Sequence, residues 1–150
     1  MVAWQKINCM RRFLFSVLTL SLYASTHAQQ CRFEKSGGKE SATYFEAIQW
    51  YKNLDKQSPR LLMKEMGPSD AGYPLHLVLV SNDGKFDPLQ WHKQNKVVVL
   101  INNGIHPGEP DGIDASMMLV RDIVTNRISL PDNVALAFIP VYNIGGCLNR

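Results

Sequence analysis

The spacing of apolar residues predicts two helices and a hairpin. In residues 43–56, apolar side chains recur every three or four positions, which predicts a helix with one buried face. Residues 111–126 repeat this spacing and begin with Asp111 and Asp114, where carboxylates favour the positive end of a helix. Two short apolar segments, 60–66 and 74–81, are separated by a glycine-containing turn and predict a β-hairpin.

Two continuous apolar segments predict strands that are buried on both faces. Residues 96–101 contain the sequence VVVLI, and residues 133–141 read NVALAFIPV. With the helix between them they form a β-α-β crossover, which makes the two strands parallel. Residues 82–95 are expected to form a loop, and residues 143–146 a turn. We therefore predict an α/β fold with a mixed, mainly parallel central sheet flanked by helices.

The first 28 residues differ from the rest of the chain. Residues 1–12 are basic and lack acids, residues 13–23 (FLFSVLTLSLY) are apolar, and residues 24–28 end in Thr-His-Ala. This order is typical of a secretory signal peptide, here with cleavage after Ala28. The apolar stretch is shorter than the ~20 residues that span a bilayer as a helix. We expect a secreted or periplasmic protein without a stable membrane anchor after cleavage, and an uncleaved anchor is the alternative.

The net charge bears on which molecules the chain can bind, and the cysteines bear on whether it contains a disulfide. The formal net charge of +3 comes from Lys6, Arg11 and Arg12, so the chain from residue 29 onward is neutral. A neutral chain without a basic cluster argues against nucleic acid as a partner. Export would allow Cys31 and Cys147 to form a disulfide, and two free thiols are the alternative. Residues 29–42 are polar and are expected to be a leader before a domain that spans 43–150.

One loop combines the residue types of a metal site. His106 and Glu109 lie three positions apart, after a predicted strand, where open α/β sheets place their ligands. A turn at Pro107-Gly108 can bring an imidazole nitrogen and a carboxylate oxygen toward one point, and zinc binds both atom types. This pair would supply two of the three protein ligands of a catalytic zinc. The alternative is a surface turn whose histidine caps a helix or bonds a carbonyl.

Three segments carry a resemblance to a known family. Residues 97–119 (VVVLINNGIHPGEPDGIDASMML) resemble the first metal-binding motif of the zinc metallocarboxypeptidases of carboxypeptidase A type, a strand followed by a His-x-x-Glu loop and a helix. Residues 44–79 are similar to the start of that catalytic domain. Residues 138–146 (FIPVYNIGG) resemble its Pro-x-x-Asn-Pro-Asp-Gly strand end, with Ile144 and Gly145 replacing proline and aspartate. The resemblance implies that His106 and Glu109 are zinc ligands.

The resemblance also implies groups that this sequence does not supply. In the family, a third histidine ligand, a general-base glutamate and a carboxylate-binding Asn-Arg pair come later in the chain. We expect no other histidine of this sequence to replace the third ligand. His76 is predicted to be a half-buried strand residue, and His92 a solvated loop residue. Asp111 and Asp114 would either hydrogen-bond His106 or stabilise their helix. Arg150 cannot be matched to a family arginine. We expect a fragment or truncated product with an unpaired sheet edge and an unfinished core.

Two functions follow as hypotheses. The first is a secreted zinc-dependent peptidase that hydrolyses peptide or other amide bonds with water activated by Zn2+. Its third ligand and general base would lie beyond this chain, so the 150 residues alone are expected to be inactive, and no catalytic residue is assigned in them. The alternative is a catalytically inactive secreted binding module, or a truncated product, of the same fold. The residues that would bind the substrate are not predicted.

Overall fold

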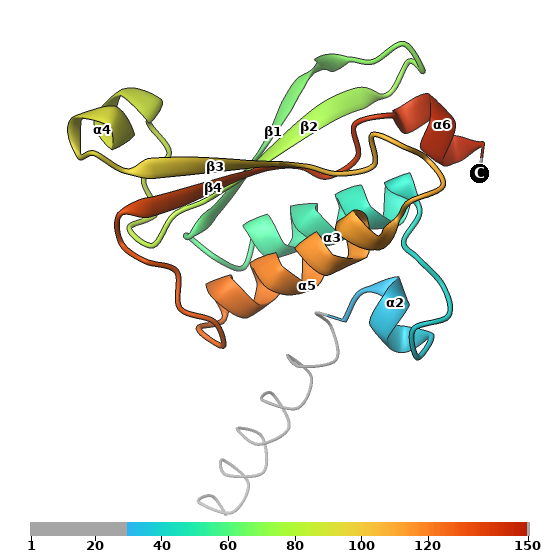
Figure 1. Cartoon of the computed structure of the whole chain (residues 1–150), viewed down its shortest axis with the longest axis horizontal. Helices are drawn as coiled ribbons and strands as arrows, with labels where there is room; N and C mark the ends of the chain where they lie inside the picture. The colour runs from blue at the N-terminus through green and yellow to red at the C-terminus, as the bar shows by residue number, and fades with distance from the viewer. Residues whose placement is uncertain (1–29, 150) are drawn as a thin grey trace, which may run out of the picture. The chain divides into compact units, whose positions relative to one another are not determined.

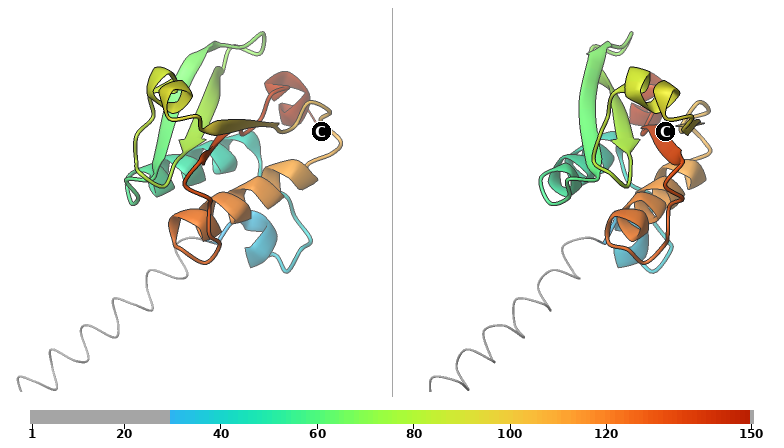
Figure 2. Two further views of the ribbon diagram at one scale, coloured as in Figure 1. Left: turned by 60° about the vertical axis from the view of Figure 1, so that its left-hand side comes forward. Right: turned by 90° about the vertical axis from the view of Figure 1, so that its left-hand side faces the viewer.

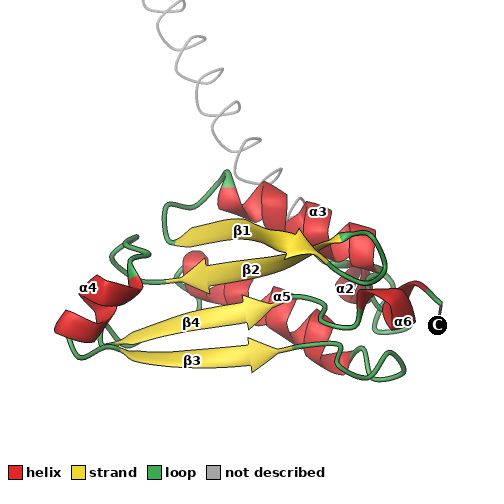
Figure 3. Cartoon of the chain, turned by 90° about the horizontal axis from the view of Figure 1, so that it is seen from above, coloured by secondary structure: helices red, strands yellow, loops and turns green. Residues whose placement is uncertain are grey.

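The computed structural model describes residues 30–149, so the predicted signal peptide and Arg150 lie outside the described residues. In these residues, four strands form one mixed sheet in the order β1-β2-β4-β3 (Figures 1 and 3). The elements in chain order are α2 (Arg32–Lys35), α3 (Tyr44–Asp55), β1 (Leu61–Pro68), β2 (Pro74–Val80), α4 (Pro88–Lys93), β3 (Val97–Asn102), α5 (Asp111–Val124), β4 (Val134–Ile139) and α6 (Ile144–Leu148).

The strand pairing confirms the predicted hairpin and crossover. β1 and β2 are antiparallel neighbours, and β2 pairs with β4 in the antiparallel sense. β3 and β4 are parallel and in register from Val97 opposite Val134 to Asn102 opposite Ile139, with α5 as the connection between them. The fold is therefore the predicted α/β type, with both strands of the crossover ending at the same edge of the sheet.

Helices α3 and α5 cover one face of the sheet (Figure 2). Thr43 begins α3 with a reciprocal cap: its Oγ accepts from the backbone N–H of Glu46, and Glu46 Oε2 accepts from the backbone N–H of Thr43. One face of α3 is buried through Tyr44, Ala47, Ile48, Tyr51 and Leu54. The larger apolar cluster lies between these helices and the sheet, as the 3.6-residue spacing predicted, and a smaller one gathers around Trp91.

The prediction that β3 is buried on both faces is wrong. Val97, Val98, Val99 and Leu100 have exposed fractions between 41% and 61%. β3 lies at the edge of the described sheet and has a partner strand, β4, on one side only. By contrast, β4 lies between two strands, and its residues from Ala135 to Phe138 are buried. The expected unpaired sheet edge is therefore found at β3.

Residues 82–95 contain a helix where a loop was expected. Asp87 caps α4 by accepting from the backbone N–H of Leu89, and Pro88 occupies the first helical position, where its missing N–H costs nothing. Trp91 is buried, and its indole N–H donates to the Lys85 carbonyl at 2.8 Å. The Asp-Pro pair therefore starts a helix here instead of a turn. The predicted turn at 143–146 likewise opens into α6, which Asn143 caps.

The segment expected to be a leader packs against the rest of the described chain from Cys31 onward. Cys31 and Ala42 are buried, and the backbone N–H of Ala42 donates to Asp114 at 3.0 Å. Glu34 of α2 forms an ion pair with the buried Arg121 of α5 at 2.6 Å. Burial opposes ionisation of Glu34, but hydrogen bonds from Arg121 and from the Cys31 backbone lower its pKa overall.

The structure also bears on the disulfide that export would allow and on the presence of membrane-spanning helices. The thiols of Cys31 and Cys147 are both buried and free. The structure therefore shows two unpaired cysteines and no disulfide between them. Among residues 30–149, no helix has the length and apolar character needed to cross a bilayer.

Candidate metal site

The candidate loop is tied to the strand end beside it. The backbone N–H of Tyr142 donates to Asn103 at 2.8 Å, and that of Asn143 donates to Gly104 at 2.9 Å. These bonds join the segments that follow the parallel strands β3 and β4. The edge formed by the carboxyl ends of these strands is where open α/β sheets bind ligands. The sequence prediction of the loop's place in the fold is therefore confirmed.

Two residues of the loop hold it against α5. The buried side chain of Asn103 donates through Nδ2 to Ser116 Oγ at 3.0 Å. Gly104 has a φ of +61°, and a methyl group there would lie 3.3 Å from Ile113 of α5. The sequence analysis did not identify Asn103. The sequence Asn-Asn-Gly after a strand indicates a turn, but not which asparagine faces inward.

His106 and Glu109 are brought together as predicted. His106 Nδ1 lies 3.1 Å from Glu109 Oε2, and a turn joins the two residues, in which the Glu109 N–H donates to the His106 carbonyl at 3.2 Å. Both side chains project into solvent, with exposed fractions of 67% and 72%. The pair is therefore accessible to an ion or a substrate from outside.

The donor set fits a zinc ion. Two ligand atoms that are each ~2.0–2.2 Å from one tetrahedral zinc lie roughly 3.3–3.6 Å apart. The observed 3.1 Å separation of Nδ1 and Oε2 needs only a small opening to reach that range. The same separation also suits a direct hydrogen bond between the two side chains. The described residues 30–149 contain no group of three His, Cys, Asp or Glu side chains placed to hold a metal.

The aspartates at the start of α5 do not support His106. Asp114 is buried and accepts from the Ala42 N–H, while its second oxygen is buried without a hydrogen-bond partner in the described chain. Asp111 and Asp114 both lie in the first turn of α5, so the helix-stabilising alternative describes them better. Asp114 thus anchors the segment before α3, a role that its spacing did not indicate.

Among residues 30–149, the other two histidines, His76 and His92, belong to elements other than the candidate loop. His92 is exposed, as predicted, although it lies on α4 and not in a loop. His76 is more buried than predicted, with 2% of its surface exposed on the helix-covered face of β2. Burial, and then the positive charge of Lys52, lower the pKa of His76, and Glu65 partly opposes them. Neither histidine is a neighbour of His106 along any described strand or helix.

Helix α6 supports the loop from the other side. Asn143 Oδ1 accepts from the Gly146 N–H at 2.9 Å, and Asn143 Nδ2 donates to the Ile105 carbonyl at 3.4 Å. A methyl group on Gly146 would lie 2.5 Å from Pro107, so the loop packs directly on α6. A hollow of about 400 Å³ lies beside Ile105 and extends to the β1–β2 turn; it is lined by Pro68, Ser69, Asp70, Leu75, Ile105, Tyr142 and Asn143.

Solved structures that resemble this chain are carboxypeptidases and a related protein. A carboxypeptidase A from Helicoverpa armigera matches with 21% identity and a TM-score of 0.63, over 73% of this chain and 26% of that chain. Bovine thrombin-activatable fibrinolysis inhibitor, solved with a tick carboxypeptidase inhibitor, matches with 20% identity and a TM-score of 0.58, over 72% and 33%. These likenesses show the fold, and the chain spans a third or less of either protein.

The sequence itself carries the family assignment. No curated protein matches the chain in a sequence comparison. The family model for zinc carboxypeptidases matches residues 47–147, which include the candidate loop and both strands of the crossover. Because this match covers more than half of the sequence, the chain belongs to the zinc carboxypeptidase family.

Proposed function

We propose that this chain carries the first part of the zinc site of a secreted peptidase, with His106 and Glu109 as two of the zinc ligands. The observation that supports this is the 3.1 Å approach of His106 Nδ1 to Glu109 Oε2, at the carboxyl ends of two parallel strands and inside the matched segment. In this proposal the third ligand and the general base belong to residues beyond this sequence. The family implies a peptide substrate.

Four residues in and beside the loop have a defined part in this proposal. When bound, zinc supplies Lewis-acid activation of water and of a peptide carbonyl. His106 offers the lone pair of Nδ1, which requires the neutral imidazole with its proton on Nε2. Glu109 contributes a negative charge. Asn103 and Asn143 hold the first part of the loop, at Asn103 and at the Ile105 carbonyl, by the hydrogen bonds described above, so that the ligand side chains start from a fixed backbone.

The test is zinc titration of the full chain, followed by the NMR signals of the histidine rings. We expect the His106 signal to shift, with a weak affinity because the pair is exposed and supplies two ligands only. His106→Ala and Glu109→Gln should each weaken zinc binding by roughly tenfold or more. His92→Ala, which removes an exposed histidine on α4, is the matched control and should bind zinc like the unchanged chain.

Equal zinc binding by the His106→Ala variant would contradict the assignment of the ligands. In that event, thermal melting of the unchanged chain with and without a chelator tests the alternative. A cooperative transition that is insensitive to chelator would support a secreted binding module without catalysis.

A further inference from the structure

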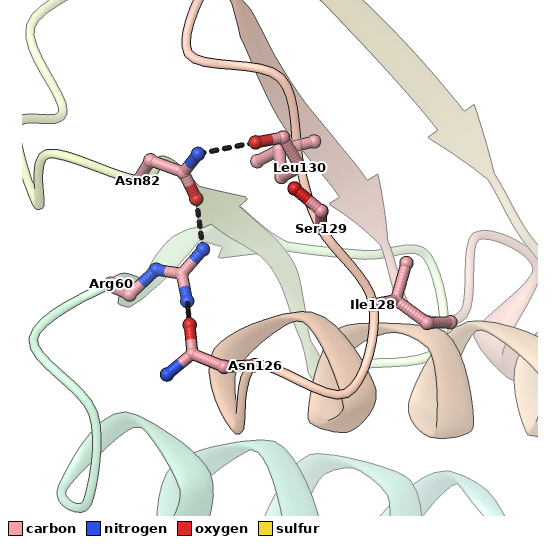
Figure 4. Close-up of a pocket in the computed structure, with 6 residues that line it drawn as sticks. All are labelled: Arg60, Asn82, Asn126, Ile128, Ser129 and Leu130. Carbon is pink, nitrogen blue, oxygen red and sulfur yellow. Dashed lines mark hydrogen bonds between the residues drawn. The ribbon is translucent and has the colours of Figure 1, made fainter.

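A second hollow lies at the end of the sheet opposite the candidate metal loop. It has a volume of about 390 Å³ and is lined by Arg60, Asn82, Asn126, Ile128, Ser129 and Leu130 (Figure 4). Arg60 precedes β1, Asn82 follows β2, and Asn126 follows α5. The hollow therefore forms where three elements meet, and none of its lining residues belongs to the proposed zinc site.

A hydrogen-bond network fixes the guanidinium group of Arg60 in the wall of this hollow. Its Nη1 donates to the Ile123 carbonyl at 2.9 Å and to Asn126 Oδ1 at 2.6 Å, and its Nη2 donates to Asn82 Oδ1 (Figure 4). Asn126 has a φ of +61°, a left-handed conformation that asparagine tolerates better than most residues. The positive group is thus held in place before any ligand arrives.

The charge of Arg60 is not neutralised by these contacts. All three acceptors are neutral oxygens, and Arg60 takes part in none of the ion pairs of residues 30–149. By contrast, Arg32 and Arg121 each contact two carboxylates. One acid, Asp132, accepts from Asn82 Nδ2 at 2.9 Å but does not line the hollow. An unneutralised, half-buried guanidinium favours an anionic partner.

Further donors surround the same space. Arg60 Nη2 carries a second hydrogen, and Asn126 Nδ2 and Ser129 Oγ form no hydrogen bond within the described part of the chain. The Ser129 hydroxyl lies across the hollow from the Arg60 guanidinium (Figure 4). The carbonyl end of α5 opposes an anion with a charge of about −0.5, which the full positive charge of Arg60 exceeds. We propose that this hollow binds an oxyanion, a carboxylate or phosphate group, through Arg60 and Ser129.

The test is titration of the full chain with inorganic phosphate and, separately, with acetate, each at constant ionic strength, followed by backbone amide NMR signals. We expect saturable shifts at Asn82 and at residues 126–130. Arg60→Met should weaken binding by roughly tenfold or more, the usual range for a hydrogen bond to a charged group. Ser129→Ala changes a loop hydroxyl that forms no described bond, so it should leave the fold intact and weaken binding roughly threefold.

Two controls separate this site from general charge effects and from the zinc proposal. Lys39→Gln removes one exposed positive charge far from Arg60 in the sequence and should bind as the unchanged chain does. His106→Ala should also leave anion binding unchanged, so failure of the zinc assignment does not affect this result. Saturation by phosphate alone identifies a phosphate site, and saturation by acetate a carboxylate site. Absence of saturation with both anions, or equal binding by Ser129→Ala and the unchanged chain, would overturn the proposal.

Discussion

At the scale of single residues, His76 is a buried base without good partners. Neither ring nitrogen forms a hydrogen bond within residues 30–149, and a carboxylate oxygen, Oε1 of Glu65, lies 3.5 Å from Nε2. Tyr44 packs near the ring, and Lys52 lies 3.6 Å from the same Glu65 oxygen. Burial and Lys52 lower the pKa of His76 in the folded chain below its value in the unfolded chain.

This predicts a loss of stability in mild acid. Because the unfolded state binds the proton more readily, the contribution of His76 is fully present above its unfolded pKa of ~6.5 and is lost as the pH falls below that value. His76→Leu should remove this part of the pH dependence. At pH 7 it should leave the free energy of unfolding unchanged or raise it by up to ~1–3 kcal/mol, since a buried unsatisfied polar group disappears.

Urea unfolding between pH 5 and pH 8 checks this expectation. His92→Ala serves as the control, because His92 is exposed on α4 and should leave the acid-side loss unaltered. If His76→Leu loses stability below pH 6.5 as steeply as the unchanged chain, His76 is not the group responsible.

At the scale of elements, the contact between α6 and the candidate metal loop depends on one glycine. A Cβ atom at Gly146 would lie 2.5 Å from Pro107 and 2.8 Å from Asn143 Oδ1. We predict that Gly146→Ala moves the loop, destabilises the fold by roughly 1–3 kcal/mol as overpacking does, and weakens zinc binding through His106. Gly145→Ala is a matched control, because among residues 30–149 its Cβ would meet Ala71 alone, at an ordinary 3.4 Å.

Thermal melting and zinc titration of both variants check this prediction. Alanine has the higher helix propensity, so Gly145→Ala in α6 should be neutral or slightly stabilising. Equal melting temperatures and zinc affinities for the two variants would mean that α6 does not position the loop.

At the scale of the whole molecule, the sequence predicted the elements that depend on local pattern. The spacing of Tyr44 to Leu54 located α3, and the run from Val97 to Ile101 located β3. Burial of β3 depends on which strands lie beside it, and no local pattern contains that information. The inward turn of Asn103 likewise depends on its contact with Ser116, which forms only in the fold.

In the candidate site, too, the local features were predictable from the sequence and the long-range contacts were not. The pairing of His106 with Glu109 followed from a three-residue spacing and a turn, which are local. The bonds that join this loop to Tyr142 and Asn143 link residues almost 40 positions apart, and the sequence placed them only through the parallel crossover. The Arg60 hollow draws on three elements and had no signal in the sequence.

The exposed edge of β3 predicts that the 150-residue chain associates with itself. An edge strand with four consecutive exposed apolar residues presents unpaired backbone groups beside a surface that water solvates poorly. The mass measured by sedimentation should therefore rise with protein concentration. Val98→Lys places a charge on this edge and should return the chain toward a monomer, because lysine on an edge strand opposes further pairing.

Leu89→Lys tests whether any loss of exposed apolar surface has this effect. Leu89 is 73% exposed on α4, so this variant replaces another exposed apolar side chain with lysine away from the strand edge. If association proceeds through β3, Leu89→Lys should associate like the unchanged chain. If both variants become monomeric, the association is a general effect of apolar surface. If neither variant does, it arises from another part of the chain, and the exposed β3 edge is not the contact.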